Sequence, residues 1–436
     1  MRQTAVAKNS HPAGLYVLFF TEMWERFSYY GMRALLVYYM TKHLLFTQEK
    51  SSQIYGLYTG FVYFTPFFGG LLADRILGQR RAVIVGGVLM AIGHFLMAFE
   101  SLFFPALIFL IFGNGAFKPN ISTQVGSLYP PGDHRRDSAF TIFYMGINLG
   151  AFFSPLICGT LGEKVGWHYG FGAAGVGMVI GLMIYIWGQK YLAPDLLMQK
   201  AAAKKSAKAK ADEPLTHDDW LKIGAIAAMM LLNIVFWGVY EQQGNTMALW
   251  ADANTDRMIF GWEMPASWFQ SFNPLMIFIF APILTGVFWS WQNRRNKEPS
   301  SIAKMGIGCF LLAASFLIML PPAQAAEAGA KASMWWLIGC TFVLTIGELY
   351  LSPIGLSLVT KVAPARIVSM MMGVWFLSSF FGNYLAGFLG TFWEKMPKQS
   401  FFLMLIAFST LAGIAFFALL KPLKKAIGHG KATVDV

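Results

Sequence analysis

Long apolar stretches separated by short polar ones dominate the chain. A helix that crosses a membrane needs about 20 predominantly apolar residues, and these stretches are close to that length. They lack the period-two alternation of β-strands, so we expect no strands. The pattern predicts an all-α membrane protein of about twelve transmembrane helices, at approximately 14–42, 53–73, 80–100, 103–128, 138–161, 168–191, 220–249, 268–291, 302–321, 333–359, 367–390 and 400–420.

The composition excludes a water-soluble globular protein. Of the 436 residues, 56% are hydrophobic, 16% aromatic and only 13% charged, whereas soluble domains carry about 25% charged residues. Forty Phe residues are easily accommodated against lipid, and Trp and Tyr favour the two interfaces. Residues 1–14 lack the apolar core of a cleaved leader, so we expect the first helix to be retained.

The three cysteines indicate neither a disulfide framework nor a metal site. Cys158, Cys309 and Cys340 lie in separate apolar stretches without a CxxC spacing. An odd, scattered set of this kind argues against both roles. We expect the three thiols to pack in the protein interior, and we expect no cofactor.

The distribution of basic residues predicts the orientation of the chain. Of the 34 Lys and Arg residues, 24 fall in one set of connecting segments, seven in the opposite set and three within the predicted helices. The positive-inside rule therefore puts both termini in the cytoplasm, which requires an even number of helices. This asymmetry also explains the net charge of +12 without nucleic acid as a partner.

The longest connection, residues 193–219, is rich in Ala and Lys and has no stretch long enough to span. It predicts a cytoplasmic linker between an N-terminal six-helix bundle, 1–192, and a C-terminal six-helix bundle, 220–436. A solvated tether is favoured over a helix lying on the membrane surface.

Charged side chains inside the predicted spans are the strongest functional signal. Each costs about 2.5–3.5 kcal/mol at the bilayer centre on insertion scales, and such residues usually face a cavity. They fall only on the first, fourth, seventh and tenth helices, which a carrier built from four three-helix repeats would place around a central cavity. The seven residues are Glu22, Glu25, Arg26, Arg33, Lys118, Glu241 and Glu348.

The first helix gathers its charges on one face. At about 100° per residue, Glu25, Arg26, Tyr29 and Arg33 all fall within about 60° of Glu22. A set of local ion pairs that stabilise the helix is the alternative explanation, because Glu22 and Arg26 have i,i+4 spacing. That explanation is weak, since burying such pairs gains little net stability.

The sum of the intramembrane charges predicts coupling to protons. Four carboxylates and three cations leave a net charge of −1, which one bound proton neutralises. A zwitterionic substrate then adds no net charge, while its amine and carboxylate meet both signs. The protonated carboxyl is also the cheaper form in a desolvated site.

A short motif between the second and third helices points to a known superfamily. The segments Gly70–Arg75 and Gly78–Arg81 resemble the cytoplasmic loop motif of the major facilitator superfamily, in which Asp74 pairs with basic residues and helix ends. The resemblance implies that fold and is silent about the substrate.

Further motifs narrow the resemblance. The ExxER pattern Glu22–Arg26 continues as Phe27–Arg33, and together with motifs along nearly the whole chain it resembles the proton-dependent oligopeptide transporter (POT) family. Those motifs are Lys118–Asn120, Phe143–Gly150, Glu241–Gly244, Phe272–Pro274, Glu348–Pro353 and Trp375–Phe376.

The resemblance implies a symporter in the bacterial inner membrane that imports di- and tripeptides by alternating access, driven by protons. It implies that Arg33 and Lys118 hold the peptide carboxylate, and that Glu348, helped by Asn273, holds the amino terminus. It further implies side-chain pockets and a proton-coupling set. The pocket residues are Tyr29, Tyr30, Tyr63, Asn148, Trp375, Phe376 and Ser379, and the proton-coupling residues are Glu22, Glu25, Arg26 and Glu241. We expect a monomer.

Two departures from the family pattern bear on mechanism. Animal relatives use a histidine on the second helix for proton handling, whereas Gly56 lies near the matching position here, so carboxylates must do that work. Many bacterial relatives also carry two additional helices between the halves, and the linker here is too short for them.

Other functions remain open at this stage. The first is another carrier on the same fold, for a drug, an anion such as nitrate or another small polar substrate; an anion carrier does not need Glu348. A membrane-embedded enzyme needs a nucleophile with a base or a metal cluster, and no such grouping is visible. A channel is disfavoured because charges of both signs would trap ions.

Overall fold

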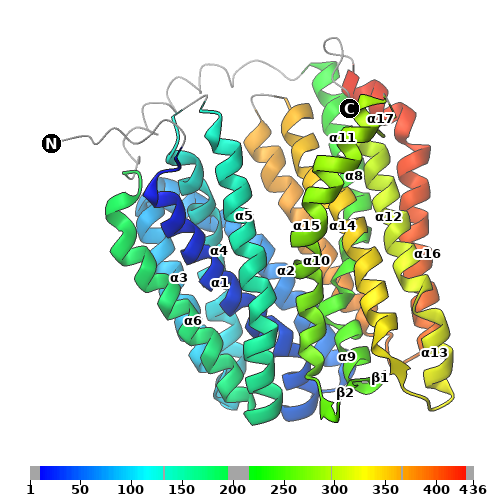
Figure 1. The fold of residues 1–436 in the computed structure, drawn as a ribbon. Helices are drawn as coiled ribbons and strands as arrows, with labels where there is room; N and C mark the ends of the chain where they lie inside the picture. Colours follow the sequence, from blue (N-terminus) through cyan, green and yellow to red (C-terminus); the bar gives the residue numbers. More distant parts are fainter. Residues whose placement is uncertain (1–9, 131–132, 195–215, 296, 365–366, 429–436) are drawn as a thin grey trace. The chain divides into compact units, whose positions relative to one another are not determined.

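The computed structural model describes residues 10–130, 133–194, 216–295, 297–364 and 367–428, and most of them lie in long helices (Figure 1). Before the central connection the helices are α1 (Ala13–Tyr38), α2 (Gln48–Leu72), α3 (Gln79–Leu96), α4 (Phe103–Ser127), α5 (Arg135–Ser154) and α6 (Trp167–Gly188). After it they are α8 (His217–Tyr240), α9 (Thr246–Ala253), α10 (Phe269–Pro282), α11 (Ser290–Arg294), α12 (Ser301–Leu317), α13 (Leu320–Glu327), α14 (Met334–Val362), α15 (Val368–Gly390), α16 (Lys398–Ala418) and α17 (Leu420–Gly428). Most of the predicted linker 193–219 falls outside the described residues.

The predicted all-α membrane fold is confirmed. Within the described part of the chain, nine helical segments are long and apolar enough to cross a membrane, from Glu100–Ser127 to Lys398–Ala418. Helices α1, α2 and α3, of 26, 25 and 18 residues, are not among the nine. For α1 the reason is visible in the sequence, because it carries four charged residues. These three helices correspond to the first three predicted spans, and the total of twelve spans stays a prediction.

The expectation of no strands is wrong at four short segments. Strand β1 (Thr255–Asp256) pairs in parallel with β4 (Ala332–Ser333), and β2 (Met258–Ile259) pairs antiparallel with β3 (Trp262–Glu263). Each strand is two residues long and lies in a connection between the predicted spans. Hydrophobic periodicity over so short a segment carries no signal.

The predicted helix 220–249 is broken in its second half. Helix α8 ends at Tyr240 and is followed by a single 3₁₀ turn, Glu241–Gly244, before α9 begins. Backbone groups freed inside a membrane need other partners. The Nε2 of Gln242 donates to the carbonyl of Gly238 at the end of α8 at 3.1 Å and to the carbonyl of Ala386 on α15 at 2.9 Å, and its Oε1 accepts from Thr246 Oγ1 at 2.9 Å. The break is therefore a stabilised feature that positions the residues on either side of it.

The loop motif after α2 forms a compact turn. A π-helical turn, Ala73–Leu77, ends at Gly78, whose φ of +79° is one that residues with a Cβ rarely adopt. Two residues on, the Arg80 guanidinium donates to the carbonyls of Leu192 at 2.6 Å and Ala193 at 2.8 Å. This hydrogen bonding ties the turn to the segment that follows α6.

The contacts divide the chain into two compact units. One consists of Met1–Leu35 with Phe64–Lys204, and the other of Leu36–Tyr63 with Lys205–Val436. The first part of α2 therefore groups with the helices of the second half of the chain. The predicted six-helix bundles 1–192 and 220–436 stay a prediction.

Two glycines bring α2 and α15 together within the second unit. A Cβ on Gly56 would lie 2.6 Å from the Cα of Gly387, and a Cβ on Gly387 would lie 2.7 Å from the carbonyl oxygen of Ser52. Small residues allow such close backbone approach in membranes, where apolar burial gives helices little drive to associate. Neither position has room for a side chain.

Uncharged hydrogen bonds hold the same contact. The Nε2 of Gln48 donates to Ser52 Oγ at 2.7 Å and to the Gly390 carbonyl at 2.8 Å, and Ser52 Oγ donates to Asn245 Oδ1 at 2.8 Å. Gln48, Ser52 and Asn245 are all buried. The contact thus combines close glycine packing with a buried amide–hydroxyl network that contains no ionisable group.

We predict that Gly56→Ala lowers the free energy of unfolding by about 1–3 kcal/mol, because the new methyl group meets backbone that cannot yield. Gly172→Ala on α6 is the matched control, since a Cβ there meets nothing within 4 Å. Alanine in an open helical position is neutral or stabilising. Thermal unfolding of both purified variants in detergent measures the difference, and equal melting temperatures would contradict the packing argument.

Candidate functional site

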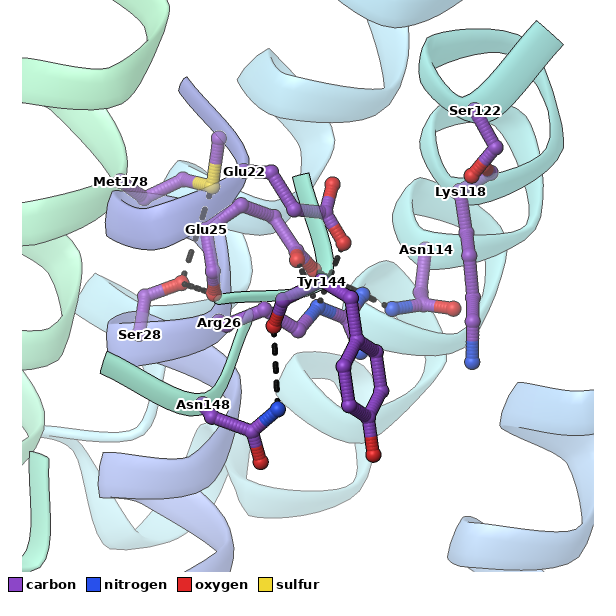
Figure 2. Close-up of polar contacts among 10 residues, drawn as sticks. All are labelled: Glu22, Glu25, Arg26, Ser28, Asn114, Lys118, Ser122, Tyr144, Asn148 and Met178. Carbon is purple, nitrogen blue, oxygen red and sulfur yellow. Dashed lines mark hydrogen bonds and ion pairs between the residues drawn. The ribbon is translucent and has the colours of Figure 1, made fainter. Parts of the chain in front are cut away.

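Three charged residues of the predicted proton-coupling set form one buried cluster on α1. Glu22, Glu25 and Arg26 are exposed by only 1%, 0% and 3%. The guanidinium of Arg26 lies between the two carboxylates: its Nη2 donates to Glu25 Oε1 at 2.8 Å, its Nε also bonds Glu25, and its Nε lies 3.2 Å from Glu22 Oε1 (Figure 2). The sequence periodicity placed these residues on one face, and the structure also shows the i,i+4 ion pair between Glu22 and Arg26 that the sequence offered as the alternative explanation.

The two carboxylates of the cluster are held differently. Glu25 makes two hydrogen bonds with Arg26 and accepts a third, at 3.3 Å, from Asn114 Nδ2 on α4. Glu22 contacts Arg26 through one oxygen, while its buried Oε2 accepts no hydrogen bond from the described part of the chain. A buried carboxylate oxygen without a donor favours protonation, because the charged form is then the costlier one. Glu22 is therefore the less firmly held of the pair.

Lys118 brings a second positive charge to this group from α4. It lies one helical turn beyond Asn114, and Figure 2 shows both residues on that helix beside the α1 cluster. Its charge acts on both Glu22 and Glu25. Lys118 thus acts, together with Arg26, on the two carboxylates of the cluster.

Arg33 and the two predicted tyrosines continue the face of α1. Arg33 is 9% exposed, and its guanidinium lies 5.8 Å from the ring centre of Tyr30. The Arg26 guanidinium lies 5.2 Å from the ring centre of Tyr29, and the two rings pack edge to face at 5.1 Å. Cations over aromatic faces gain most where water is excluded. One face of α1 therefore carries two cations, each beside a phenol ring, and the two rings are in contact.

Asn148 is buried on α5, and its Nδ2 donates to the Tyr144 carbonyl within its own helix at 3.0 Å. Figure 2 shows Asn148 and Tyr144 close to the α1 cluster. Asn114 contacts Glu25 directly but was not among the predicted site residues. The sequence marks it only by its position one helical turn before Lys118.

In the second unit, Glu348 is the centre of a separate polar group. Its Oε2 accepts hydrogen bonds from Asn273 Nδ2 on α10 at 3.0 Å and from the hydroxyl of Tyr240 at the end of α8 at 2.5 Å. Asn273 also donates to Thr345 Oγ1 at 3.0 Å, one turn before Glu348 on α14. Asn273 is thus in direct hydrogen-bond contact with Glu348, while the part of both residues in binding an amino terminus stays a prediction. Tyr240 and Thr345 were missed, and only their spacing from Glu241 and Glu348 marks them in the sequence.

The remaining predicted residues lie on other elements of the second unit. Glu241 is 3% exposed, in the 3₁₀ turn that follows α8. Trp375 on α15 is buried, Ser379 is half-buried and Phe376 is 45% exposed. Tyr63 on α2 is half-buried. The roles of these residues in substrate binding and proton coupling stay predictions.

Structural findings on the cysteines agree with a packing role. Cys158, Cys309 and Cys340 are buried free thiols. Over the residues that the structure describes, no group of three His, Cys, Asp or Glu side chains could hold a metal ion.

Comparisons with known proteins show to which family the chain belongs. The family model described as the POT family matches residues 80–210 and 195–408. The peptide transporter YePEPT of Yersinia enterocolitica is 36% identical over 87% of this chain and 88% of its own. A di-/tripeptide transporter of Lactococcus lactis subsp. cremoris is 33% identical over 96% of this chain and 97% of its own.

Solved structures give the same result. A peptide transporter POT in complex with alafosfalin has a TM-score of 0.87 and 32% identity, covering 97% of each chain. A POT family transporter in complex with 5-aminolevulinic acid has a TM-score of 0.83 and 29% identity, covering 95% of this chain and 98% of that one.

Long apolar helices that bury clustered charges, in a fold shared with these structures, define a membrane transporter of the major facilitator type. The chain belongs to the POT family. It is thus a member of a family of transporters and not an enzyme.

We predict that Arg26→Met lowers the free energy of unfolding by about 3–5 kcal/mol, because it leaves two buried carboxylates without their cation. The double variant Arg26→Met/Glu25→Gln should recover part of that loss, since one uncompensated charge is removed with it. Lys395→Met is the control: its ammonium lies 2.8 Å from Glu49, but both side chains are about half exposed, and such surface pairs contribute little. Thermal unfolding in detergent compares the three variants; an Arg26→Met protein as stable as the control would refute the assignment.

Proposed function

We propose that this protein imports di- and tripeptides together with protons, by alternating access, across a bacterial inner membrane. The observation that carries the proposal is the buried Glu22–Glu25–Arg26 cluster, in which one cation serves two carboxylates and one carboxylate oxygen lacks a donor. Relatives named as peptide transporters over nearly the whole chain support the choice of substrate.

Proton coupling follows from the charge balance of the cluster. Protonating Glu22 weakens its attraction for Arg26 and changes how strongly Arg26 holds Glu25. The two carboxylates titrate as a coupled pair, so the coupling proton belongs to the cluster and not to one residue. Glu241, buried in the 3₁₀ turn, is a further candidate for proton coupling. The proton is the only coupling ion we propose, and no cofactor is required.

Peptide recognition uses the features that all short peptides share. Arg33 and Lys118 bind the peptide carboxylate, and Glu348, oriented by Asn273, binds the amino terminus. Charge-assisted hydrogen bonds to the two ends give affinity without reading the sequence. Looser side-chain pockets account for tolerance of many peptides, and their lining comprises Tyr29, Tyr30, Tyr63, Asn148, Trp375, Phe376 and Ser379.

We further propose that the chain acts as a monomer with both termini in the cytoplasm. The excess of Lys and Arg in alternate connecting segments supports this orientation.

A second candidate is a carrier for another small polar substrate. One similar POT family transporter is described in complex with 5-aminolevulinic acid, a molecule that also carries an amine and a carboxylate. The two candidates differ in which compound competes best for the same site.

We expect purified protein in proteoliposomes to accumulate a labelled dipeptide under an inward proton gradient, and a protonophore to abolish the accumulation. Glu22→Gln and Glu25→Gln should reduce gradient-driven uptake to the level without a gradient while retaining peptide exchange, because the amides cannot carry the proton. Glu100→Gln, at an exposed position before α4, controls for loss of a carboxylate. Wild-type uptake that ignores the gradient would refute coupling.

We expect Arg33→Ala and Glu348→Ala each to weaken dipeptide binding about 10- to 100-fold, the range for losing a hydrogen bond to a charged group. Equilibrium binding should also show that each variant loses one preference. Arg33→Ala should distinguish the peptide from its C-terminal amide less well, with Lys118 still present, and Glu348→Ala should no longer distinguish it from the N-acetylated form. Competition by 5-aminolevulinic acid that is stronger than that of any dipeptide would favour the second candidate.

A further inference from the structure

The hydroxyl of Tyr240 makes a short hydrogen bond to the carboxylate proposed to bind the peptide amine. Its Oη donates to Glu348 Oε2 at 2.5 Å, and the Tyr240 side chain is 7% exposed. The phenol ring is fixed on two sides within α8. It stacks on Phe236 with ring centres 5.8 Å apart and an angle of 16°, and packs edge to face against Trp237 at 5.1 Å. The hydroxyl is therefore held in place by its ring.

Two helices act on the same carboxylate oxygen. Asn273 on α10 donates to Glu348 Oε2 at 3.0 Å, from a different element than Tyr240 on α8. Thr345 fixes the amide of Asn273, because its Oγ1 accepts from Asn273 at 3.0 Å and donates to the Thr341 carbonyl at 2.7 Å. The two donors therefore fix the orientation of the carboxylate from two different helices.

The position of Tyr240 is set by the break after α8. Tyr240 is the last residue of that helix, and Glu241 begins the 3₁₀ turn. The turn is anchored by the hydrogen bonds of Gln242 to Ala386 and Thr246. The point of the chain that supplies the hydroxyl is therefore fixed independently of Glu348.

We infer that Tyr240 is a positioning residue for peptide binding: its hydroxyl orients the carboxylate of Glu348 toward the amino group of the substrate. The inference rests on the proposed function and adds to it a determinant of selectivity for a free amine. Tyr240 acts through Glu348 and not on the peptide itself.

The test is equilibrium binding and uptake of one dipeptide and its N-acetylated form by wild-type protein and Tyr240→Phe. The variant keeps the ring and loses only the hydroxyl. We expect binding of the free-amine peptide to weaken about tenfold, with KM rising and kcat little changed, while the weak binding of the acetylated peptide stays the same. Equal losses for both peptides, or an unchanged KM, would overturn the inference.

Two further variants separate this role from a general structural effect. Tyr185→Phe removes a buried hydroxyl that donates to Gln124 Oε1 at 2.9 Å in the first unit, and it should leave amine selectivity unchanged. In a Glu348→Gln background, Tyr240→Phe should cause no further loss of binding, because the carboxylate through which it acts is gone. A full additional loss in that background overturns the role.

Failure of the proposed function gives a different result. If wild-type protein binds no dipeptide, the proposed function falls and the inference falls with it. If wild-type protein binds the dipeptide and prefers the free amine, but Tyr240→Phe behaves like wild type, only the inference is overturned.

Discussion

The ion pair between Arg26 and the two glutamates of α1 governs the chemistry of the first unit. Charges at the centre of a bilayer are costly unless they are paired and hydrogen-bonded. Arg26 satisfies Glu25 with two hydrogen bonds but contacts Glu22 through one oxygen only. The arrangement is stable enough to be buried, yet it leaves the second carboxylate incompletely held. That imbalance is the basis of the proton-coupling role proposed for the cluster.

In the second unit, neutral donors contribute to holding the half-buried carboxylate of Glu348. It accepts hydrogen bonds from the phenol of Tyr240 and the amide of Asn273, and Thr345 fixes that amide in turn. The donors lie on α8 and α10, whereas Glu348 lies on α14. The orientation of the carboxylate therefore depends on how those two helices pack against α14.

The sequence was sufficient to predict the helices and much of the charged site. The length of the apolar stretches identified membrane-spanning helices, because a helix must be about 20 apolar residues long to cross the hydrocarbon core. The helical periodicity of α1 correctly placed Glu22, Glu25 and Arg26 on one face. The end of α8 at Tyr240 was missed although the run Glu241–Thr246 that follows is polar and contains Gly244, because Glu241 was interpreted as a functional charge inside a span and not as the end of a helix. Asn114 and Tyr240 were missed because their importance comes from a carboxylate on another helix. The short strands were missed because two residues carry no period.

The close contact between Gly56 and Gly387 also constrains how this chain could evolve. The resemblance to the family associates this part of the second helix with a proton-handling histidine in animal relatives. Here an imidazole at position 56 would collide with the backbone of α15, and even a methyl group has no room. No single substitution at position 56 can restore such a histidine while α15 remains where it is. A side chain at position 56 therefore requires a displacement of α15 as well as the substitution itself.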